Sequence, residues 1–151
     1  MLPAQNVKYA VCVAPQAIKD NASWTTSELD TKGWEYLEVI ALAGATDIAM
    51  AALAVTESDT TGSGHANVTG LIWGTSANID GDTSALPSAT DDNKFQVAHI
   101  DLRHRKRFID VTATAGDGTN GTYLTIIYRL SRGKVVPDTT TEMGADEVLR
   151  V

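Results

Sequence analysis

The fold is decided by the stretch Thr122-Tyr123-Leu124-Thr125-Ile126-Ile127-Tyr128-Arg129-Leu130. Large apolar residues recur there at every second position: Leu124, Ile126, Tyr128 and Leu130. Successive side chains of a strand point to opposite faces, so this period of two predicts a strand with one buried face. Thr125 and Arg129 would lie on the other face, where Tyr123 and Ile127 weaken the contrast.

Further segments rich in β-branched and aromatic residues lie between turn signals, which predicts more strands. They are residues 7–13, 34–42, 47–57, 66–73, 95–102 and 107–115. The stretch 48–55 has strong helix formers and no clear period, and we interpret it as a strand from its length and its closeness to the preceding strand. Six or seven evenly spaced strands predict an all-β fold: an antiparallel β-sandwich, jelly-roll-like, or a barrel.

Proline and glycine mark the expected ends of these strands. Pro15 cannot donate to a sheet ladder and ends the first strand, and Gly44 ends the second. Residues 116–121 hold glycines and an asparagine that tolerate positive φ, which predicts a hairpin loop between the last two strands. Residues 74–93 form a long polar connection, a length typical of loops that act on a ligand or pack on a partner.

The pattern changes after Gly133, which divides the chain into a single β domain, residues 1–133, and a C-terminal segment, residues 134–151. Few apolar residues occur in this segment before Val148, Leu149 and Val151 at its tip. The segment is therefore either disordered or an arm laid along a neighbouring subunit. We predict an extended arm whose apolar tip makes a subunit contact.

The net charge of the chain limits the classes of partner that it can bind. Nineteen Asp and Glu against twelve Lys and Arg give a net charge of -7, which opposes general binding to nucleic acid or to an anionic membrane. Neither a secretory signal nor an apolar run of about 18 residues is found, so we expect a soluble protein made in the cytoplasm. The single cysteine, Cys12, excludes an intramolecular disulfide framework.

Signatures of catalysis and metal binding are missing from the sequence. His65, His99 and His104 are scattered, and no nucleophile elbow, zinc-protease motif or phosphate-binding loop accompanies them. The acidic loops at residues 80–82, 91–93 and 117–120 do not match the calcium loop of an EF-hand and are typical of turns. We therefore expect no catalytic residue, no metal site and no cofactor, and predict that the protein is not an enzyme.

A basic run stands out in this acidic chain. Arg103, Arg105, Lys106 and Arg107 place four of the twelve cationic side chains in five residues. The run is either a solvated hairpin turn between two strands or a contact patch for an acidic protein surface, because arginine binds carboxylates with two hydrogen bonds. Nucleic acid is the weaker alternative, since only Phe108 adjoins the charges as a stacking partner.

The three tryptophans, Trp24, Trp34 and Trp73, are typical of a core, but Trp24 lies between Ser23 and Thr25 in a polar stretch. We therefore predict that Trp24 lies at an interface with a partner.

Several segments resemble the small β-rich proteins encoded among the head genes of tailed bacteriophages. They are Leu86-Pro87-Ser88-Ala89-Thr90-Asp91-Asp92-Asn93-Lys94-Phe95, His99-Ile100-Asp101-Leu102-Arg103, Val111-Thr112-Ala113-Thr114-Ala115-Gly116-Asp117-Gly118, Ile18-Lys19-Asp20, Trp34-Glu35-Tyr36-Leu37 and Gly44-Ala45-Thr46-Asp47. The resemblance covers most of residues 7–133 and consists of strand and turn patterns. It implies a capsid decoration (cement) protein, commonly trimeric, which sits where capsomers meet and reinforces the shell.

The function expected from this resemblance is that of a structural virion protein on the outside of a phage capsid. Its partners would be the major capsid protein and further copies of the chain, most simply as a homotrimer, with neither nucleic acid nor membrane involved. The alternative is another phage β-module, such as a tail or fibre component or a carbohydrate-binding domain. A sugar-binding module should gather exposed aromatic and polar groups in one groove, whereas a cement protein should place them at subunit contacts.

Overall fold

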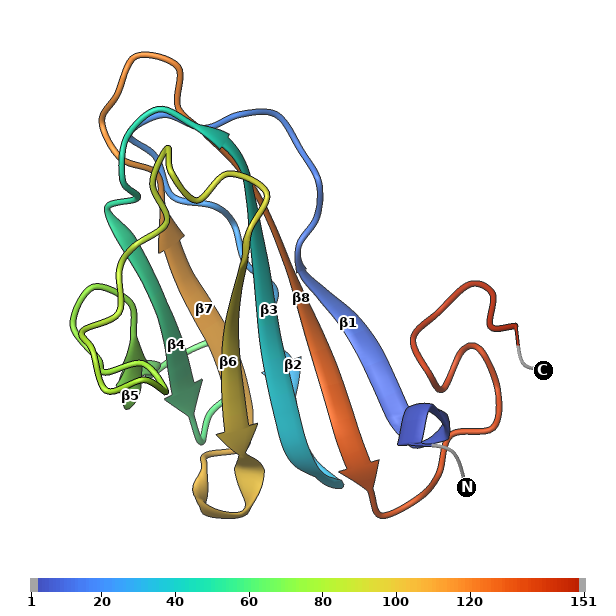
Figure 1. Ribbon diagram of the computed structural model, residues 1–151. Helices are drawn as coiled ribbons and strands as arrows, with labels where there is room; N and C mark the ends of the chain where they lie inside the picture. Colours follow the sequence, from blue (N-terminus) through green and yellow to red (C-terminus); the bar gives the residue numbers. More distant parts are fainter. Residues whose placement is uncertain (1–2, 150–151) are drawn as a thin grey trace.

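A computed structural model describes residues 3–149. Within this range two antiparallel four-stranded sheets pack face to face as a β-sandwich, so the all-β prediction is confirmed (Figure 1). Two single-turn 3₁₀ helices, η1 and η2, are the helical segments of the described residues. The elements are η1 (Pro3–Gln5), β1 (Val7–Val13), β2 (Leu29–Asp30), β3 (Trp34–Thr46), β4 (Ala52–Ser58), β5 (Ala66–Ile72), β6 (Phe95–Asp101), η2 (Leu102–His104), β7 (Phe108–Thr114) and β8 (Thr122–Gly133).

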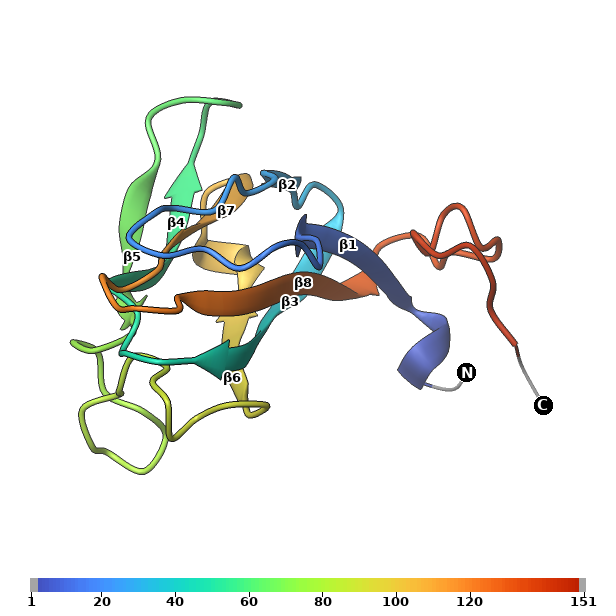
Figure 2. The same cartoon turned by 90° about the horizontal axis from the view of Figure 1, so that it is seen from above.

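The first sheet, called sheet I here, has the strand order β1-β8-β3-β6, and the second, sheet II, has the order β2-β7-β4-β5. Figure 2 shows the two layers from above, with β1, β8, β3 and β6 in one layer and β2, β7, β4 and β5 in the other. Strands that follow one another in the chain mostly lie in opposite sheets: β3 and β4, β6 and β7, and β7 and β8. Among consecutive strands, β4 and β5 pair directly.

This alternation corrects two sequence-based expectations. Residues 116–121 were expected in a hairpin loop, and a hairpin turn was one of the two interpretations of the basic run at residues 103–107, but each segment connects a strand of one sheet to a strand of the other. Consecutive strands usually lie side by side, which is the basis on which hairpins were predicted. In this chain each strand has one apolar face, and the core needs a layer of strands on each of its two sides. When consecutive strands lie in opposite sheets, the apolar face of each strand points into the core.

Strand β8 lies at the centre of sheet I, between β1 and β3, and its buried positions match the sequence period. Its inward side chains meet those of β7 from the opposite sheet in one core cluster. From β8 these are Leu124, Ile126, Tyr128 and Leu130, and from β7 they are Ile109, Val111 and Ala113. The sandwich therefore rests on these two complementary apolar faces, each taken from a central strand.

Several boundaries differ from the expected ones. Strand β3 continues past Gly44 to Thr46 through an irregularity in its pairing with β8, because the missing side chain at Gly44 leaves room for Tyr123. Residues 47–51 are not in a strand, and β4 begins at Ala52. The two-residue strand β2 pairs with β7 and was not predicted, since so short a segment carries no periodic signal.

The long connection at residues 74–93 is held by its own hydrogen bonds and by the core. Ser84 N donates to Ser76 O at 2.8 Å, and Met50 N donates to Pro87 O at 2.9 Å. Leu86 packs against the core cluster. The loop is therefore packed on the domain. No helix in the described range has the length and apolar character needed to cross a membrane.

Replacing Tyr128 with Phe should lower the free energy of unfolding by about 1 kcal/mol, because the hydrogen bond from the buried Tyr128 side chain to the Ser27 carbonyl would be lost. The Tyr128 hydroxyl donates to Ser27 O at 3.1 Å, and the ring is 1% exposed. Denaturant titration followed by circular dichroism measures the change. Tyr123→Phe is the matched control on the same strand, because Tyr123 is 46% exposed and the same atom is lost with a change of at most about 0.5 kcal/mol.

Candidate interaction surfaces

The cations of the basic run are paired with carboxylates of the same chain. Arg103 Nε lies 2.9 Å from Asp101 Oδ1, and Arg107 Nε lies 2.8 Å from Asp30 Oδ1 with a second contact from Nη2 to Oδ2 at 2.6 Å. The Arg103 guanidinium holds the pKa of Asp101 well below its usual range, and Arg107 does the same for Asp30. The guanidinium of Arg107 also stacks over the Phe108 ring at 4.9 Å.

The other two cations of the run meet the end of β4 and the residue that follows it. Arg105 Nη1 lies 3.5 Å from Glu57 Oε1, and Lys106 Nζ lies 3.9 Å from Asp59 Oδ2. Exposed pairs of this kind each contribute about 0–1 kcal/mol. Their main effect is on the surface potential, because the connection between β6 and β7 carries its positive charge beside an equal number of carboxylates.

The expectation that Trp24 lies at an interface is wrong for this chain. Trp24 is 5% exposed and belongs to the core cluster, while its neighbours Ser23 and Thr25 are exposed. The segment is extended along β7, where Trp24 N donates to Ala113 O and Ser23 forms a bridge with Thr114. Alternate side chains of an extended segment face opposite sides, so polar neighbours in the sequence do not indicate that Trp24 is exposed.

The C-terminal segment folds back on its own chain up to residue 145 and is not an extended arm there. Met143 N donates to Thr139 O at 3.1 Å, and Ala145 N donates to Thr140 O at 2.9 Å, which makes two successive turns. Met143 is buried, and its carbonyl accepts from Tyr9 N of β1 at 2.8 Å. Gly144 is required at this contact, because a Cβ there would lie 2.0 Å from Tyr9 O.

The expected anchor residues at the tip behave differently from one another. Val148 is half-buried in a small hollow beside Met143 and Thr139, whereas Leu149 is 94% exposed. Val151 lies outside the described residues. Within the described range the tip therefore presents Leu149 to the solvent.

The outer face of sheet I carries an apolar row that crosses all four strands. Val11 of β1 pairs with Ile127 of β8, Ile127 pairs with Ile40 of β3, and Ile40 pairs with Val97 of β6. Directly paired residues share one face of a sheet, so the four side chains form a continuous row. Val11 is 54% exposed and Val97 is 44% exposed, while the two isoleucines between them are partly exposed.

Further apolar residues extend this row on one side, and polar residues border it on the other. Leu42 lies opposite Phe95, which is 67% exposed, and together with the row they form what we call the apolar strip: Val11, Ile127, Ile40, Val97, Leu42 and Phe95. On the other side, Arg129 and Glu38 form an ion pair of 2.7 Å between Tyr9 and His99. An apolar centre with a polar border is typical of a protein interface.

A groove of about 480 Å³ opens where the edge strands β5 and β6 of the two sheets face each other. Its wall includes Leu71 and Trp73 from the β5 side and Ala98 from β6. Gly70, with a φ of +91°, allows the irregularity in β5 pairing beyond which Leu71 and Trp73 pack against the core. The volume lies in the range of ligand pockets.

Most polar side chains along this groove are already engaged within the domain. Trp73 Nε1 donates to Gln96 Oε1 at 3.0 Å, and Ser84 Oγ donates to Ser76 O at 2.7 Å. Asn78 Oδ1 accepts from the backbone of Asp80 at 3.0 Å. The groove therefore offers mainly apolar surface to an occupant.

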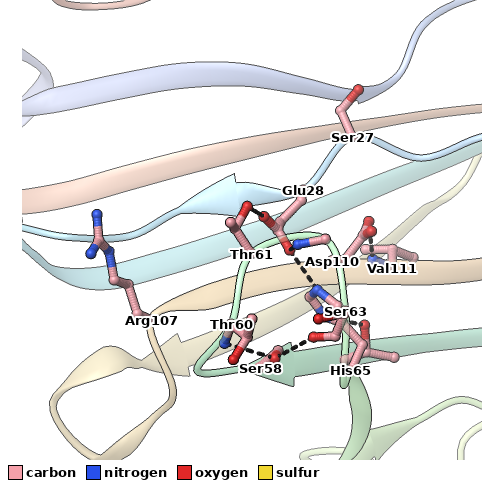
Figure 3. Close-up of polar contacts among 12 residues, drawn as sticks. Ser27, Glu28, Ser58, Thr60, Thr61, Ser63, His65, Arg107, Asp110 and Val111 are labelled. Atoms are coloured by element: carbon pink, nitrogen blue, oxygen red, sulfur yellow. Dashed lines mark hydrogen bonds and ion pairs between the residues drawn. The ribbon is translucent and has the colours of Figure 1, made fainter.

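A cluster of polar contacts surrounds Glu28, just before β2 (Figure 3). Its carboxylate accepts from Thr61 Oγ1 at 2.6 Å and from Gly62 N at 2.9 Å, and it lies 2.6 Å from His65 Nε2. These contacts, led by the Thr61 hydroxyl, lower the pKa of Glu28. The cluster fastens the loop between β4 and β5 to the start of β2.

Asp47 has a comparable role at the other end of the sandwich. Its carboxylate accepts from the backbone N–H groups of Thr119, Asn120 and Gly121, which lowers its pKa. Gly118 N donates to Asp20 at 2.9 Å. The loop between β7 and β8, expected from its glycines to be a turn, is therefore held by two carboxylates from elsewhere in the chain.

Among residues 3–149, no three His, Cys, Asp or Glu side chains come together in a way that could hold a metal ion. Cys12 is buried, and burial raises the pKa of its thiol to about 11, which keeps it protonated and unreactive near neutral pH. His99 lies with its ring centroid 6.2 Å from that of Tyr36 on the outer face of sheet I. No known protein family, curated protein or solved structure matches the chain.

The free energy of unfolding should fall as the pH drops below about 4. The carboxylates of Glu28, Asp30, Asp47, Asp91 and Asp101 have pKa values below those of the unfolded chain, so the unfolded state binds more protons in acid. Their stabilisation is present above the unfolded pKa and is lost as the pH falls through the folded pKa. Denaturant titrations between pH 2 and 7 measure this slope.

Asp47→Asn should flatten the acid slope, because one titrating group is removed, and should lower the stability at pH 7. Asp80→Asn, on the exposed turn of the long loop, is the matched control and should change the stability at pH 7 by at most about 0.5 kcal/mol. An Asp47→Asn slope equal to that of the wild type would show that the Asp47 contacts do not contribute.

Proposed function

We propose that the chain is a structural virion protein that binds the outside of a phage capsid and stabilises it, as a decoration (cement) protein. The observation that favours this role is the apolar strip on the outer face of sheet I. An exposed sheet face with an apolar row across four strands suits docking on another protein surface. The proposed role uses no catalytic residue and no cofactor.

The proposal includes a jelly-roll topology for the sandwich. Eight strands in the orders β1-β8-β3-β6 and β2-β7-β4-β5 support it, because a jelly roll is a double sheet of eight strands wound as two Greek keys. Viral capsid and lectin domains use this architecture, so the topology is compatible with both the main proposal and its alternative.

The proposed partners are the major capsid protein and further copies of the chain, in a homotrimer on the capsid surface. The internal ion pairs of Arg103, Arg105, Lys106 and Arg107 bear on how docking occurs. Because these cations already have carboxylate partners, an acidic capsid surface would compete with them, and the apolar strip is the stronger candidate for the main contact. Attachment through the strip is expected to depend weakly on salt.

The alternative function is a different phage β-module, such as a tail or fibre component or a carbohydrate-binding domain. The specific observation in its favour is the groove beside Trp73, since an aromatic wall can stack on a sugar ring. Against it, the Trp73 and Asn78 groups that would bind hydroxyls are occupied by contacts within the domain.

Val11→Glu combined with Phe95→Glu should weaken attachment to shells assembled from the capsid protein of the same virus by tenfold or more. The two residues lie on opposite edge strands, at either end of the strip, and both are exposed, so the charges disturb docking and not the core. Co-sedimentation of the purified chain with the shells measures attachment. Burying one charge against an apolar partner surface costs several kcal/mol, which is the physical reason for the loss.

Ala66→Glu combined with Thr69→Glu is the matched control, with two exposed residues of β5 in the opposite sheet. This variant should pellet with the shells as the wild type does. If the strip variant also pellets normally while Arg103→Glu combined with Arg107→Glu fails, the basic run is the docking site. Wild-type protein that stays in the supernatant at tens of micromolar contradicts the proposal.

A further inference from the structure

The groove between β5 and β6 lies along strand edges that have no partner strand within the described range. Strand β6 pairs with β3 on one side, and its other edge faces the groove. The groove wall is mainly aliphatic and aromatic: Leu71, Trp73, Ile79, Ala85, Val97 and Ala98. Ile79 at the groove is 99% exposed. An uncovered strand edge beside an apolar groove is suited to bind an extended apolar segment.

The opposite edge of sheet I, formed by β1, is covered. Strand β1 is covered by the C-terminal segment, where Tyr9 N donates to Met143 O and Gly144 lies against Tyr9. Pro137 and Met143 are buried and fix the base of this segment on its own subunit. One edge of sheet I is therefore closed by the chain itself, and the other is open.

The tip of the C-terminal segment presents an apolar side chain to the solvent. Leu149 is 94% exposed and follows the fixed turn at residues 139–145. Figures 1 and 2 both place this segment beside β1, on the side of the sandwich away from β5. Because its base is held at β1, the tip lies across the width of the sheet from the groove of its own subunit.

We propose that the groove between β5 and β6 receives Leu149 from the C-terminal segment of a second copy of this chain. The proposal rests on the proposed function and deepens its self-association. It assigns one occupant, an aliphatic side chain on an extended segment, to a groove whose polar groups are mostly engaged.

Such a contact joins two different surfaces, the tip of one subunit and the groove of the next. Contacts of this kind leave a free tip and a free groove after each addition, and they close into a ring when the rotation allows. A ring of three satisfies every groove and every tip, which is the arrangement expected of the proposed homotrimer. Val97 belongs to both the groove wall and the apolar strip, and the other five residues of the strip are left free to meet the capsid.

Disulfide trapping tests the contact directly. The native thiol, Cys12, is 2% exposed, so cysteines introduced at the surface are the ones that react. Leu149→Cys mixed with Ile79→Cys should give a disulfide-linked dimer after mild oxidation, seen on a non-reducing gel. Val135→Cys mixed with Ile79→Cys is the matched control, because Val135 is 82% exposed but lies at the base of the segment, and it should stay mostly unlinked.

Two further variants test the contact without new thiols. Leu149→Asp removes the apolar tip, and Ala85→Trp fills the groove from an exposed position. Each should raise the dissociation constant for self-association about tenfold to hundredfold, as expected for the loss of one buried leucine. Sedimentation velocity measures the mass, and Ala89→Trp, an exposed loop alanine that does not line the groove, should associate as the wild type does.

The results separate this inference from the proposed function. Unchanged association of both Leu149→Asp and Ala85→Trp, or equal trapping by Val135→Cys and Leu149→Cys, overturns the inference. Association lost in Leu149→Asp alone also overturns it, because the tip then binds elsewhere. Neither Leu149 nor Ala85 belongs to the apolar strip, so shell attachment through Val11 and Phe95 is tested independently.

Discussion

The structure depends on the burial of one face of β8 against one face of β7. Tyr128 and Leu130 from the first strand meet Ile109 and Val111 from the second, and the neighbouring strands extend the same two layers. Each sheet alone would leave an apolar face in water, so neither is stable without the other. This constraint forces the chain to cross repeatedly between the sheets, and the long connections at the ends of the sandwich follow from it.

Several loops at the ends of the sandwich are held by carboxylates of the chain itself. Asp47 binds three backbone N–H groups of the β7–β8 loop, Glu28 fastens the β4–β5 loop, and Asp30 and Asp101 pair with the basic run. Many of the acidic residues that give the chain its net charge of -7 therefore bind groups of the same chain. The basic run, which in the sequence is typical of a contact patch, forms ion pairs that hold loops in place.

The two candidate surfaces for partners, the apolar strip and the groove, are mainly apolar. The strip on sheet I is a row of paired side chains that alternation along the strands places on the solvent side, and the groove is the gap between two unpaired edges. The C-terminal segment protects the β1 edge, which removes one site of uncontrolled strand pairing. A protein whose surface is organised in this way is suited to make defined contacts, and both proposals rest on that organisation.

The sequence by itself determined the class of fold and most of the strands, because period-two alternation and turn residues act over a few neighbouring residues. It also determined that the chain has no intramolecular disulfide framework, because Cys12 is its single cysteine. Only the tertiary structure decided which strands pair, that Trp24 is buried, and that Arg107 faces Asp30. The ion pairs and the strip join residues that lie far apart in the sequence, such as Val11 and Ile127. Such contacts depend on the packing of the two sheets, and no local pattern encodes that packing.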